Sequence, residues 1–328
     1  MKLQLIRPLL LFITVIILSI EYQKTIKPKY KHIIIADTQQ PVFGLIYIAD
    51  KMGYFKSQGL KVSYRKFDIG KKALDDVIEG NSDLATVFES PVVHKIFQGK
   101  PIKIITTLHT SKQNTALIVR KDKQINKLSD LVGKKIAVTK GTNADFFLNL
   151  LLKTEGIDKD KLTIIDLPAD QATHELWNGT IDAAALYNPY LYIAQQRLEN
   201  NGQTYFSEVY TETSLIAGTN FVNPINKSKL VKLLTAIEQA EQYVQNHKQN
   251  SQQIIDDWLP MYDRKTIIDT WDSYQLITKL DNKLISIMER EAQFYYDTGV
   301  YRQEIPYFLD HIYFQYLQAV DPEHVTIY

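Results

Sequence analysis

The chain has 328 residues, of which 45% are hydrophobic and 23% charged, and its formal net charge is +1 at pH 7. This length suits one or two domains with large cores. The near-neutral charge and the lack of a long basic run give no reason to expect a nucleic acid partner. Cysteine is absent, which excludes disulfides, thiolate metal sites and cysteine nucleophiles. We expect no metal and no cofactor.

An apolar stretch follows positive charge at the N-terminus. Lys2 and Arg7 precede residues 9–20, in which only Thr14 and Ser19 are polar. About a dozen apolar residues are typical of a signal-peptide core, because a helix that spans a bilayer needs roughly 20. No small-residue cleavage site is evident. We interpret residues 1–29 as a signal peptide or an N-terminal anchor and expect a monomer in the periplasm, either free or anchored to the inner membrane by this segment.

Short apolar strands alternate with helical patterns from about residue 32 to residue 221, which is typical of parallel βαβ units. Ser90 and Pro91 are predicted to open one of the helices, with Ser90 as its N-cap. The predicted strands cover residues 32–37, 84–88, 102–108, 114–120, 135–139, 162–166, 181–186 and 214–222, and a further strand begins near residue 60, after an amphipathic helix in 41–58. The pattern from about 226 to 319 is wholly helical.

The alternation breaks at residues 114–120, where a strand follows a strand without a helix between them. A second βαβ series then begins. We therefore predict an α/β fold with two lobes joined by two crossings, near 114–120 and 213–222. Such paired crossings form a hinge that lets a cleft close over a ligand. The first lobe is expected to comprise residues 30–116 and 220–328, including the C-terminal helices, and the second lobe residues 117–219.

Several motifs carry a family resemblance when they are taken in order. They are PVFGLIYIADKMGYFKSQGLKV at 41–62, ALDDVIEGNSDLA at 73–85, DLVGKKIAV at 130–138, NGTIDA at 178–183, YNPY at 187–190, WDSY at 271–274 and IPYFLD at 305–310. In this order the chain resembles the extracytoplasmic substrate-binding proteins of nitrate, aliphatic-sulfonate and taurine ABC importers, within a thiamine-precursor-binding-like superfamily. It has Tyr187 where many members have tryptophan.

The resemblance implies a bilobed periplasmic binding protein fold of type II, with a hinge of two crossing strands. It also implies capture of a small anionic or zwitterionic solute by lobe closure, and a membrane permease with its ATPase as partners. Two alternatives stay open. One is a binding protein for a thiamine-precursor pyrimidine, and the other is a membrane-tethered sensor with the same fold.

Candidate ligand residues follow the ends of the predicted strands, because ligands of open α/β sheets bind at the carboxyl ends of strands. In the first series they are Thr38, Gln39, Gln40, Pro41, Phe43, Glu89, Ser90, His109 and Asn114. In the second series and at the return crossing they are Gly141, Thr142, Asn143, Tyr187, Asn188 and Thr219. For each group the alternative is an ordinary helix cap or a solvated turn.

Two of these groups predict different ligand chemistry. Gly141, Thr142 and Asn143 open a helix, where unpaired backbone N–H groups and the helix dipole suit an oxyanion. Glu89, if it enters the cleft, repels a bare anion and favours a ligand with an amine or a ring N–H. A zwitterion such as taurine, or an aminopyrimidine, then fits better than nitrate.

Enzyme motifs are missing from the sequence. The chain has no G-x-S-x-G elbow, no phosphate-binding G-x-x-x-x-G-K-[ST] loop and no H-E-x-x-H, and its seven histidines have no metal-ligand spacing. Related bilobed folds include pyrimidine-forming enzymes of thiamine synthesis, but their reactive cysteine cluster has no counterpart here. We therefore expect a binding protein and not an enzyme.

Overall fold

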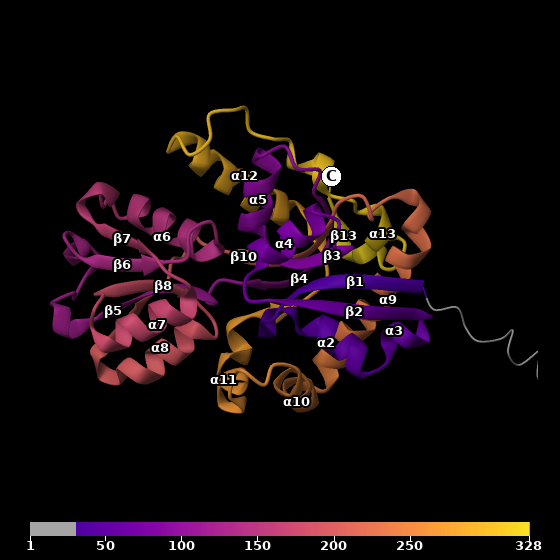
Figure 1. Cartoon of the computed structure of the whole chain (residues 1–328), viewed down its shortest axis with the longest axis horizontal. Coiled ribbons are helices and arrows are strands. Elements are labelled where there is room, and N and C mark those ends of the chain that lie inside the picture. The colour runs from indigo at the N-terminus through magenta and orange to yellow at the C-terminus, as the bar shows by residue number, and fades with distance from the viewer. Residues whose placement is uncertain (1–30, 328) are drawn as a thin grey trace, which may run out of the picture.

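The computed structural model describes residues 31–327, so the predicted signal peptide or anchor lies outside the described residues. Two mixed β-sheets lie side by side along the long axis of the molecule, with helices on their faces (Figure 1). Within the described range, no helix combines the length and the apolar character needed to cross a bilayer. The predicted α/β architecture with two sheets is confirmed.

The first sheet has six strands in the order β11-β4-β10-β3-β1-β2. Strands β1, β2 and β3 run parallel, so their carboxyl ends share one edge, and β10 lies antiparallel between β3 and β4. Every residue of β3 and β10 is buried, as their central positions require. The strands are β1 (Lys31–Thr38), β2 (Leu60–Phe67), β3 (Leu84–Phe88), β4 (Lys103–Ser111), β10 (Glu212–Gly218) and β11 (Gln275–Leu276).

Helices cover both faces of this sheet. They are η1 (Pro41–Phe43), α2 (Gly44–Lys51), α3 (Tyr54–Ser57), α4 (Gly70–Ile78) and α5 (Glu89–Phe97). One predicted cap is wrong: α5 begins at Glu89 with Phe88 as its N-cap, so Ser90 lies inside the first turn. The chain is still extended at Phe88 and turns into the helix directly afterwards, which buries both Glu89 and Ser90.

The second sheet has five strands in the order β7-β6-β8-β5-β9. They are β5 (Thr115–Arg120), β6 (Lys135–Val138), β7 (Thr163–Asp166), β8 (Ala183–Tyr187) and β9 (Gly202–Tyr205), with the helices α6 (Asn143–Thr154), α7 (Ala169–Asn178) and α8 (Tyr190–Leu198). The sequence prediction missed α8 and β9. Leu191, Ala194 and Leu198 are the buried residues of α8 and have helical spacing, but polar residues and tyrosines between them weaken the pattern.

The two sheets are connected by short crossings at residues 112–114 and 206–211. The segments predicted as crossings, 114–120 and 213–222, instead form β5 in the second sheet and β10 in the first. Strand β10 has seven buried residues and pairs on both sides, with β3 and β4. A lobe boundary at residue 219 therefore separates β10 from the sheet to which it belongs.

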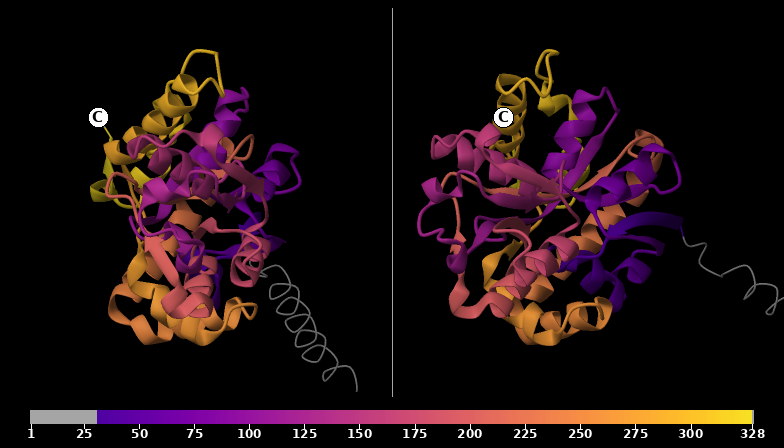
Figure 2. Two further views of the ribbon diagram at one scale, coloured as in Figure 1. Left: turned by 90° about the vertical axis from the view of Figure 1, so that its left-hand side faces the viewer. Right: turned by 60° about the vertical axis from the view of Figure 1, so that its left-hand side comes forward.

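The C-terminal third of the chain wraps around the first sheet. Figure 2 shows α10 and α11 (orange) on one side of the molecule and α12 (yellow) on the other. The prediction of a wholly helical segment from about 226 to 319 is wrong where β11 and one further short strand, β12, interrupt it. The elements are α9 (Lys227–Asn246), α10 (Lys248–Trp258), α11 (Arg264–Thr270), η7 (Trp271–Ser273), β12 (Leu280–Asp281), α12 (Asn282–Asp297), η8 (Phe308–His311), α13 (Gln315–Gln318), η9 (Pro322–His324) and β13 (Val325–Thr326). The remaining short helices are η2 (Lys121–Lys123), η3 (Leu128–Leu131), η4 (Lys159–Lys161), η5 (Glu199–Asn201) and η6 (Pro224–Asn226).

Gly218 ends β10 in close contact with buried side chains. A Cβ atom there would lie 2.7 Å from Val222 Cγ2 and 2.9 Å from Leu84 Cδ2, and both of those residues are fully buried. We expect Gly218→Ala to lower the free energy of unfolding by about 1–3 kcal/mol, measured by urea denaturation. In a double-mutant cycle with Val222→Ala the losses should be less than additive, because the smaller side chain makes room. Strict additivity would contradict this account.

Candidate ligand-binding site

The carboxyl ends of β3 and β8 face each other across the junction of the two sheets. Phe88 ends β3, and its ring centroid lies 5.8 Å from that of Phe43, 5.4 Å from that of His109 and 6.5 Å from that of Tyr187. Strand β10 brings Phe88 and His109 together, because Ser214 pairs with both. Residues predicted from the ends of three different strands thus meet around Phe88.

His109 is fully buried and neutral. Its Nδ1 accepts a hydrogen bond from the backbone N–H of Ser214 at 3.0 Å, so the ring proton is assigned to Nε2. Burial lowers the pKa of His109 to about 3. The Nε2 atom has no hydrogen-bond partner within residues 31–327 and lies 3.9 Å from Glu212 Oε1. His109 therefore offers a free N–H donor.

Glu212 links the two sheets. It begins β10 and is fully buried, yet its carboxylate accepts hydrogen bonds from Thr115 Oγ1 at 2.6 Å, Asn143 Nδ2 at 2.7 Å and Tyr210 O–H at 2.8 Å. Asn114 Nδ2 donates a fourth. Burial raises the pKa of Glu212, and these hydrogen bonds oppose the rise. The sequence prediction included Asn114 and Asn143 but missed Glu212 and Tyr210.

Glu89 lies next to this link. Its Oε2 accepts the backbone N–H of Thr213 at 3.0 Å, whereas its Oε1 has no partner in the described chain. Burial raises the pKa of Glu89 well above its usual range, and the charges of Glu291 and Glu212 add to the rise. Glu291 comes from α12, and Tyr295 donates to its Oε1 at 3.0 Å. Three buried carboxyl groups thus share this part of the interior.

The loop after β1 contributes amide groups. Thr38 is held by the backbone of β3, since its Oγ1 donates to Thr86 O at 2.7 Å. Gln39 Nε2 and Gln40 Oε1 are buried without partners in the part of the chain that the structure describes. The side chain of Gln40 also forms a hydrogen bond with Tyr187. Burial raises the pKa of Tyr187, and this hydrogen bond partly opposes the rise. Pro41 begins η1 and is buried beneath this loop.

The start of α6 is already occupied by the chain itself. The backbone N–H of Gly141 donates to Asp145 Oδ2 at 2.9 Å, and the Thr142 hydroxyl donates to Thr139 O at 2.7 Å. A carboxylate therefore lies where the sequence analysis expected an oxyanion. Only Asn143 of the three predicted residues reaches the group around Glu212, while Gly141 lines a separate cavity of about 170 Å³.

Two other predicted positions lie farther from Phe88. Asn188 donates its backbone N–H to Asn114 O at 2.8 Å, and its side chain donates to Ser273 Oγ at 3.1 Å. Thr219 follows the opposite end of β10, where Gly218 pairs with the first residues of β3 and β4. The structure thus places Asn188 at the edge of the group and Thr219 outside it.

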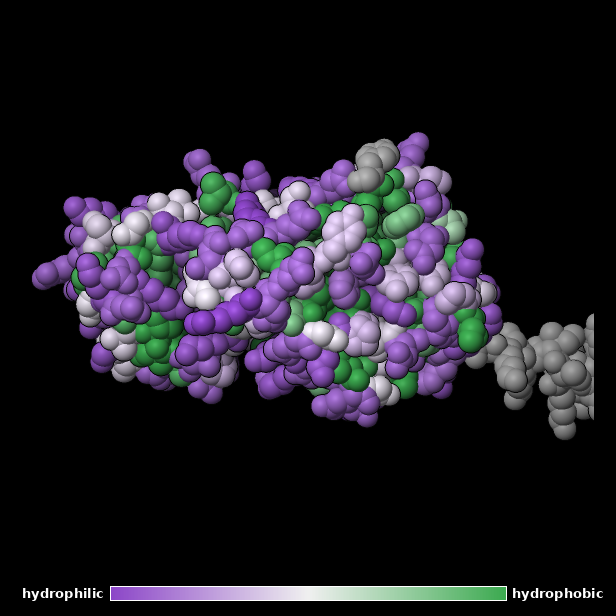
Figure 3. Space-filling view, turned by 90° about the horizontal axis from the view of Figure 1, so that it is seen from above, coloured by the Kyte–Doolittle hydropathy of each residue, from purple (hydrophilic) through white to green (hydrophobic). Residues whose placement is uncertain are grey.

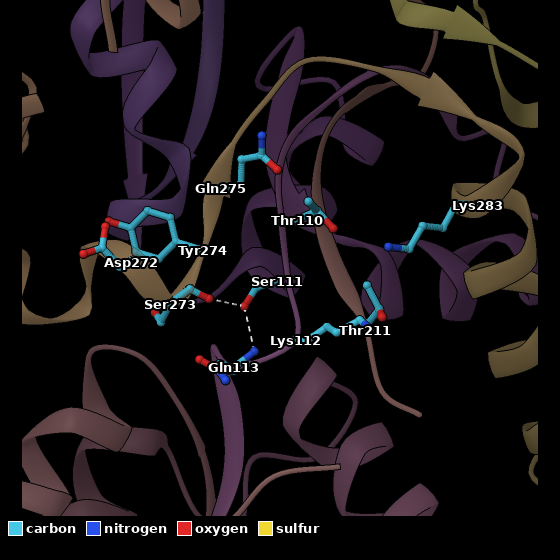
Figure 4. A pocket seen from close by; sticks show the side chains of 10 residues that line it. All are labelled: Thr110, Ser111, Lys112, Gln113, Thr211, Asp272, Ser273, Tyr274, Gln275 and Lys283. Atoms are coloured by element: carbon cyan, nitrogen blue, oxygen red, sulfur yellow. Dashed lines mark hydrogen bonds between the residues drawn. The ribbon is translucent and has the colours of Figure 1, made fainter. Parts of the chain in front are cut away.

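A cavity of about 340 Å³ lies on the flank of the crossings, lined by residues that include Thr110, Thr211 and Lys283 (Figure 4). The hydroxyl of Ser111 accepts the backbone N–H of Gln113 at 2.9 Å and donates to Ser273 O. None of the predicted ligand residues lines this cavity. On the face seen in Figure 3, mainly hydrophilic side chains cover the surface where the two halves meet.

Glu212 provides a test of this site. In Glu212→Gln an amide N–H₂ replaces one carboxylate oxygen. This donor then faces side chains that donate hydrogen bonds to the oxygen in the wild type. Because two donors cannot pair, we expect the free energy of unfolding to fall by about 1–3 kcal/mol. Urea denaturation measures the loss. Glu155→Gln, at an exposed position, is the matched control and should be neutral. Equal stability of the two variants would contradict the role of Glu212 as a link.

Glu291 provides a second test. Burial raises its pKa from 4.5 to about 8, so between these values the folded chain holds a proton that the unfolded chain has released. This group makes the free energy of unfolding fall as pH rises from 4.5 to 8, by up to about 1.4 kcal/mol per pH unit. Glu291→Gln lacks this group, so the free energy of unfolding of wild type minus that of the variant should fall as pH rises from 4.5 to 8, measured by urea denaturation across this range. A constant difference would contradict the shift.

Known proteins resemble this chain in sequence and in fold. A putative aliphatic sulfonates-binding protein of Bacillus subtilis is 23% identical over 269 residues, which cover 79% of this chain and 80% of that protein. The taurine-binding periplasmic protein of Escherichia coli is 29% identical over 150 residues, 46% of this chain and 45% of that protein. The solved alkanesulfonate-binding protein of Xanthomonas axonopodis pv. citri, bound to MOPS, has a TM-score of 0.73 at 15% identity and covers 86% of this chain and 98% of its own. The family model NMT1/THI5 like matches residues 40–251, more than half of the sequence, so the chain belongs to the NMT1/THI5-like family.

Proposed function

We propose that this chain is the extracytoplasmic solute-binding component of an ABC importer. It captures a small anionic or zwitterionic solute, of the sulfonate, taurine or nitrate class, between its two halves. The proposal is supported by relatives named as sulfonate- and taurine-binding proteins and by the fold shared with a sulfonate-binding protein. The implied partners are a membrane permease and its ATPase, and the implied location is the periplasm. No catalytic step is required.

One observation carries the proposal: buried polar atoms without partners gather at the junction of the sheets. Within residues 31–327 they include Gln39 Nε2, Gln40 Oε1, Glu89 Oε1, His109 Nε2 and Asn114 Oδ1. Folded proteins leave few buried polar atoms unpaired, since each costs about 1–3 kcal/mol. A solute that supplies partners at this junction recovers much of that cost.

Capture requires the two halves to move. We assign the six-stranded sheet with the C-terminal helices to the first lobe and the five-stranded sheet to the second, with residues 112–114 and 206–211 as the hinge. In the present arrangement Phe88, Tyr187 and His109 are buried between the sheets. A solute therefore enters when the lobes separate and is enclosed when they close.

A thiamine-precursor pyrimidine is the second candidate solute. Aromatic rings of Phe43, Phe88 and Tyr187 surround the junction, and Glu89 Oε1 and Asn114 Oδ1 are free acceptors beside them. A flat ring with an amino group suits such a set of rings and acceptors. Asp145 at the start of α6, in contrast, makes that helix end a poor site for a bare anion such as nitrate.

The function can be tested by thermal unfolding and calorimetry of the purified protein with taurine, ethanesulfonate, nitrate and an aminopyrimidine. A solute at about 100 times its Kd should stabilise the protein by roughly 2.7 kcal/mol. Binding of taurine or ethanesulfonate would support the first proposal, and binding of the aminopyrimidine alone would favour the second. Absence of binding by every solute would contradict both.

Gln40 tests where that solute binds. Gln40→Ala should weaken its binding by about tenfold, because one hydrogen bond contributes about 1.4 kcal/mol. The matched control is Gln242→Ala on the exposed side of α9, which should bind normally. Calorimetry on both variants measures the change. Unaltered affinity in Gln40→Ala would place the solute elsewhere.

A further inference from the structure

We propose that the cavity beside the two crossings is a second binding site, which takes a small oxyanion with two or more negative charges, such as pyrophosphate. The cavity shares no lining residue with the group around Phe88, so this inference does not rest on the proposed function. Three features of the described chain support it: a polar cavity of suitable size, cations without carboxylate partners, and the convergence of three separate segments on one place.

The first feature is the cavity itself. Its volume is about 340 Å³, and every residue that lines it has a polar or charged side-chain group. Because one water occupies about 30 Å³ in the liquid, the cavity has room for a small oxyanion together with several waters. Lys283 extends from α12 toward Thr110 (Figure 4). The hydroxyl of Thr211 also lines the cavity and forms no hydrogen bond within residues 31–327, so it is free to donate to an anion.

The second feature is positive charge that no carboxylate neutralises. Lys112 and Lys283 line the cavity, and neither forms an ion pair in the part of the chain that the structure describes. Burial lowers the pKa of Lys283, and nearby positive charges lower it further. These charges belong to Lys279, Lys112 and Arg290. Because like charges repel one another, an anion placed among them is attracted by all of them.

The acidic side chains beside the cavity are already engaged with other lysines. Asp272 lines the cavity, but its carboxylate pairs with Lys248 Nζ at 2.7 Å. Asp281 pairs with Lys279 Nζ at 3.0 Å. Glu208 lines a neighbouring cavity and forms no ion pair among the described residues. Cations are therefore in excess at this cavity, and an oxyanion with a single charge would neutralise only part of the excess.

The third feature is the origin of these groups in three segments of the chain. Lys112 lies in the first crossing, and Thr211 lies in the second. Lys283 and Arg290 are seven residues apart on α12 and therefore share a face of the helix. Arg290 Nη1 donates to Val209 O at 2.7 Å, so α12 already contacts the second crossing. An oxyanion bound by Lys112 and Lys283 ties the first crossing to α12 as well.

Calorimetry of the purified protein with pyrophosphate, at constant ionic strength, tests this site. Pyrophosphate should bind about tenfold more tightly than inorganic phosphate, because it carries more charge. Lys283→Gln and Lys112→Gln should each weaken pyrophosphate binding about tenfold. Both lysines are exposed, so the variants should fold with an unchanged Tm. Lys100→Gln is the matched control, since Lys100 is exposed beyond the opposite end of β4, and it should bind as the wild type does.

Four outcomes would overturn the proposal. The first is no binding of pyrophosphate to the wild-type protein, and the second is an equal loss of affinity in Lys100→Gln, which would trace the attraction to net charge alone. The third is weaker pyrophosphate binding in Gln40→Ala, which would place the ion in the proposed solute site. The fourth is binding to vesicles of phosphatidylglycerol without binding of pyrophosphate, which would identify a lipid headgroup in place of a free oxyanion.

Discussion

The buried carboxylate of Glu212 is the interaction on which the arrangement of the two sheets depends. It begins β10 in the first sheet and accepts hydrogen bonds from Asn114 in the first crossing and from Thr115 and Asn143, which begin β5 and α6 in the second half. Charge-assisted hydrogen bonds are about twice as strong as neutral ones and weaken steeply with misalignment. One carboxylate therefore holds both crossings in register, and the junction of the sheets becomes a polar interior.

That polar interior explains why the candidate site is so strongly constrained. Ser214 fixes the tautomer of His109, and Thr213 fixes one oxygen of Glu89, so both side chains present a single defined atom toward the junction. The rings of Phe43, Phe88 and His109 pack together here, and both atoms are buried. In such surroundings hydrogen bonds to a solute are stronger than in water, and unpaired groups are correspondingly costly.

The sequence predicted much of this fold because its strands are short apolar runs separated by helical periodicity. Strands 32–37, 84–88 and 135–139 were predicted within two residues of β1, β3 and β6. It predicted a strand at 214–222 but not the antiparallel place of β10 between β3 and β4, because that place depends on long-range pairing. Glu212 was missed for a related reason: Thr211, Thr213 and Ser214 surround it, and such a polar run is typical of a loop. The occupied start of α6 had a visible signal, since Asp145 in a first helical turn is a common partner of backbone N–H groups.

The contacts across the cleft suggest how closure is balanced. Tyr192 of α8 donates to Asp269 of α11, and Asn188 donates to Ser273 at 3.1 Å. Tyr192 and Asp269 lie near the surface, where such polar contacts contribute at most about 1 kcal/mol each. Closure without a solute leaves several buried atoms unpaired, and their cost is comparable to or larger than these gains. Under the proposed function, the closed arrangement is therefore favoured mainly when a solute supplies the missing partners.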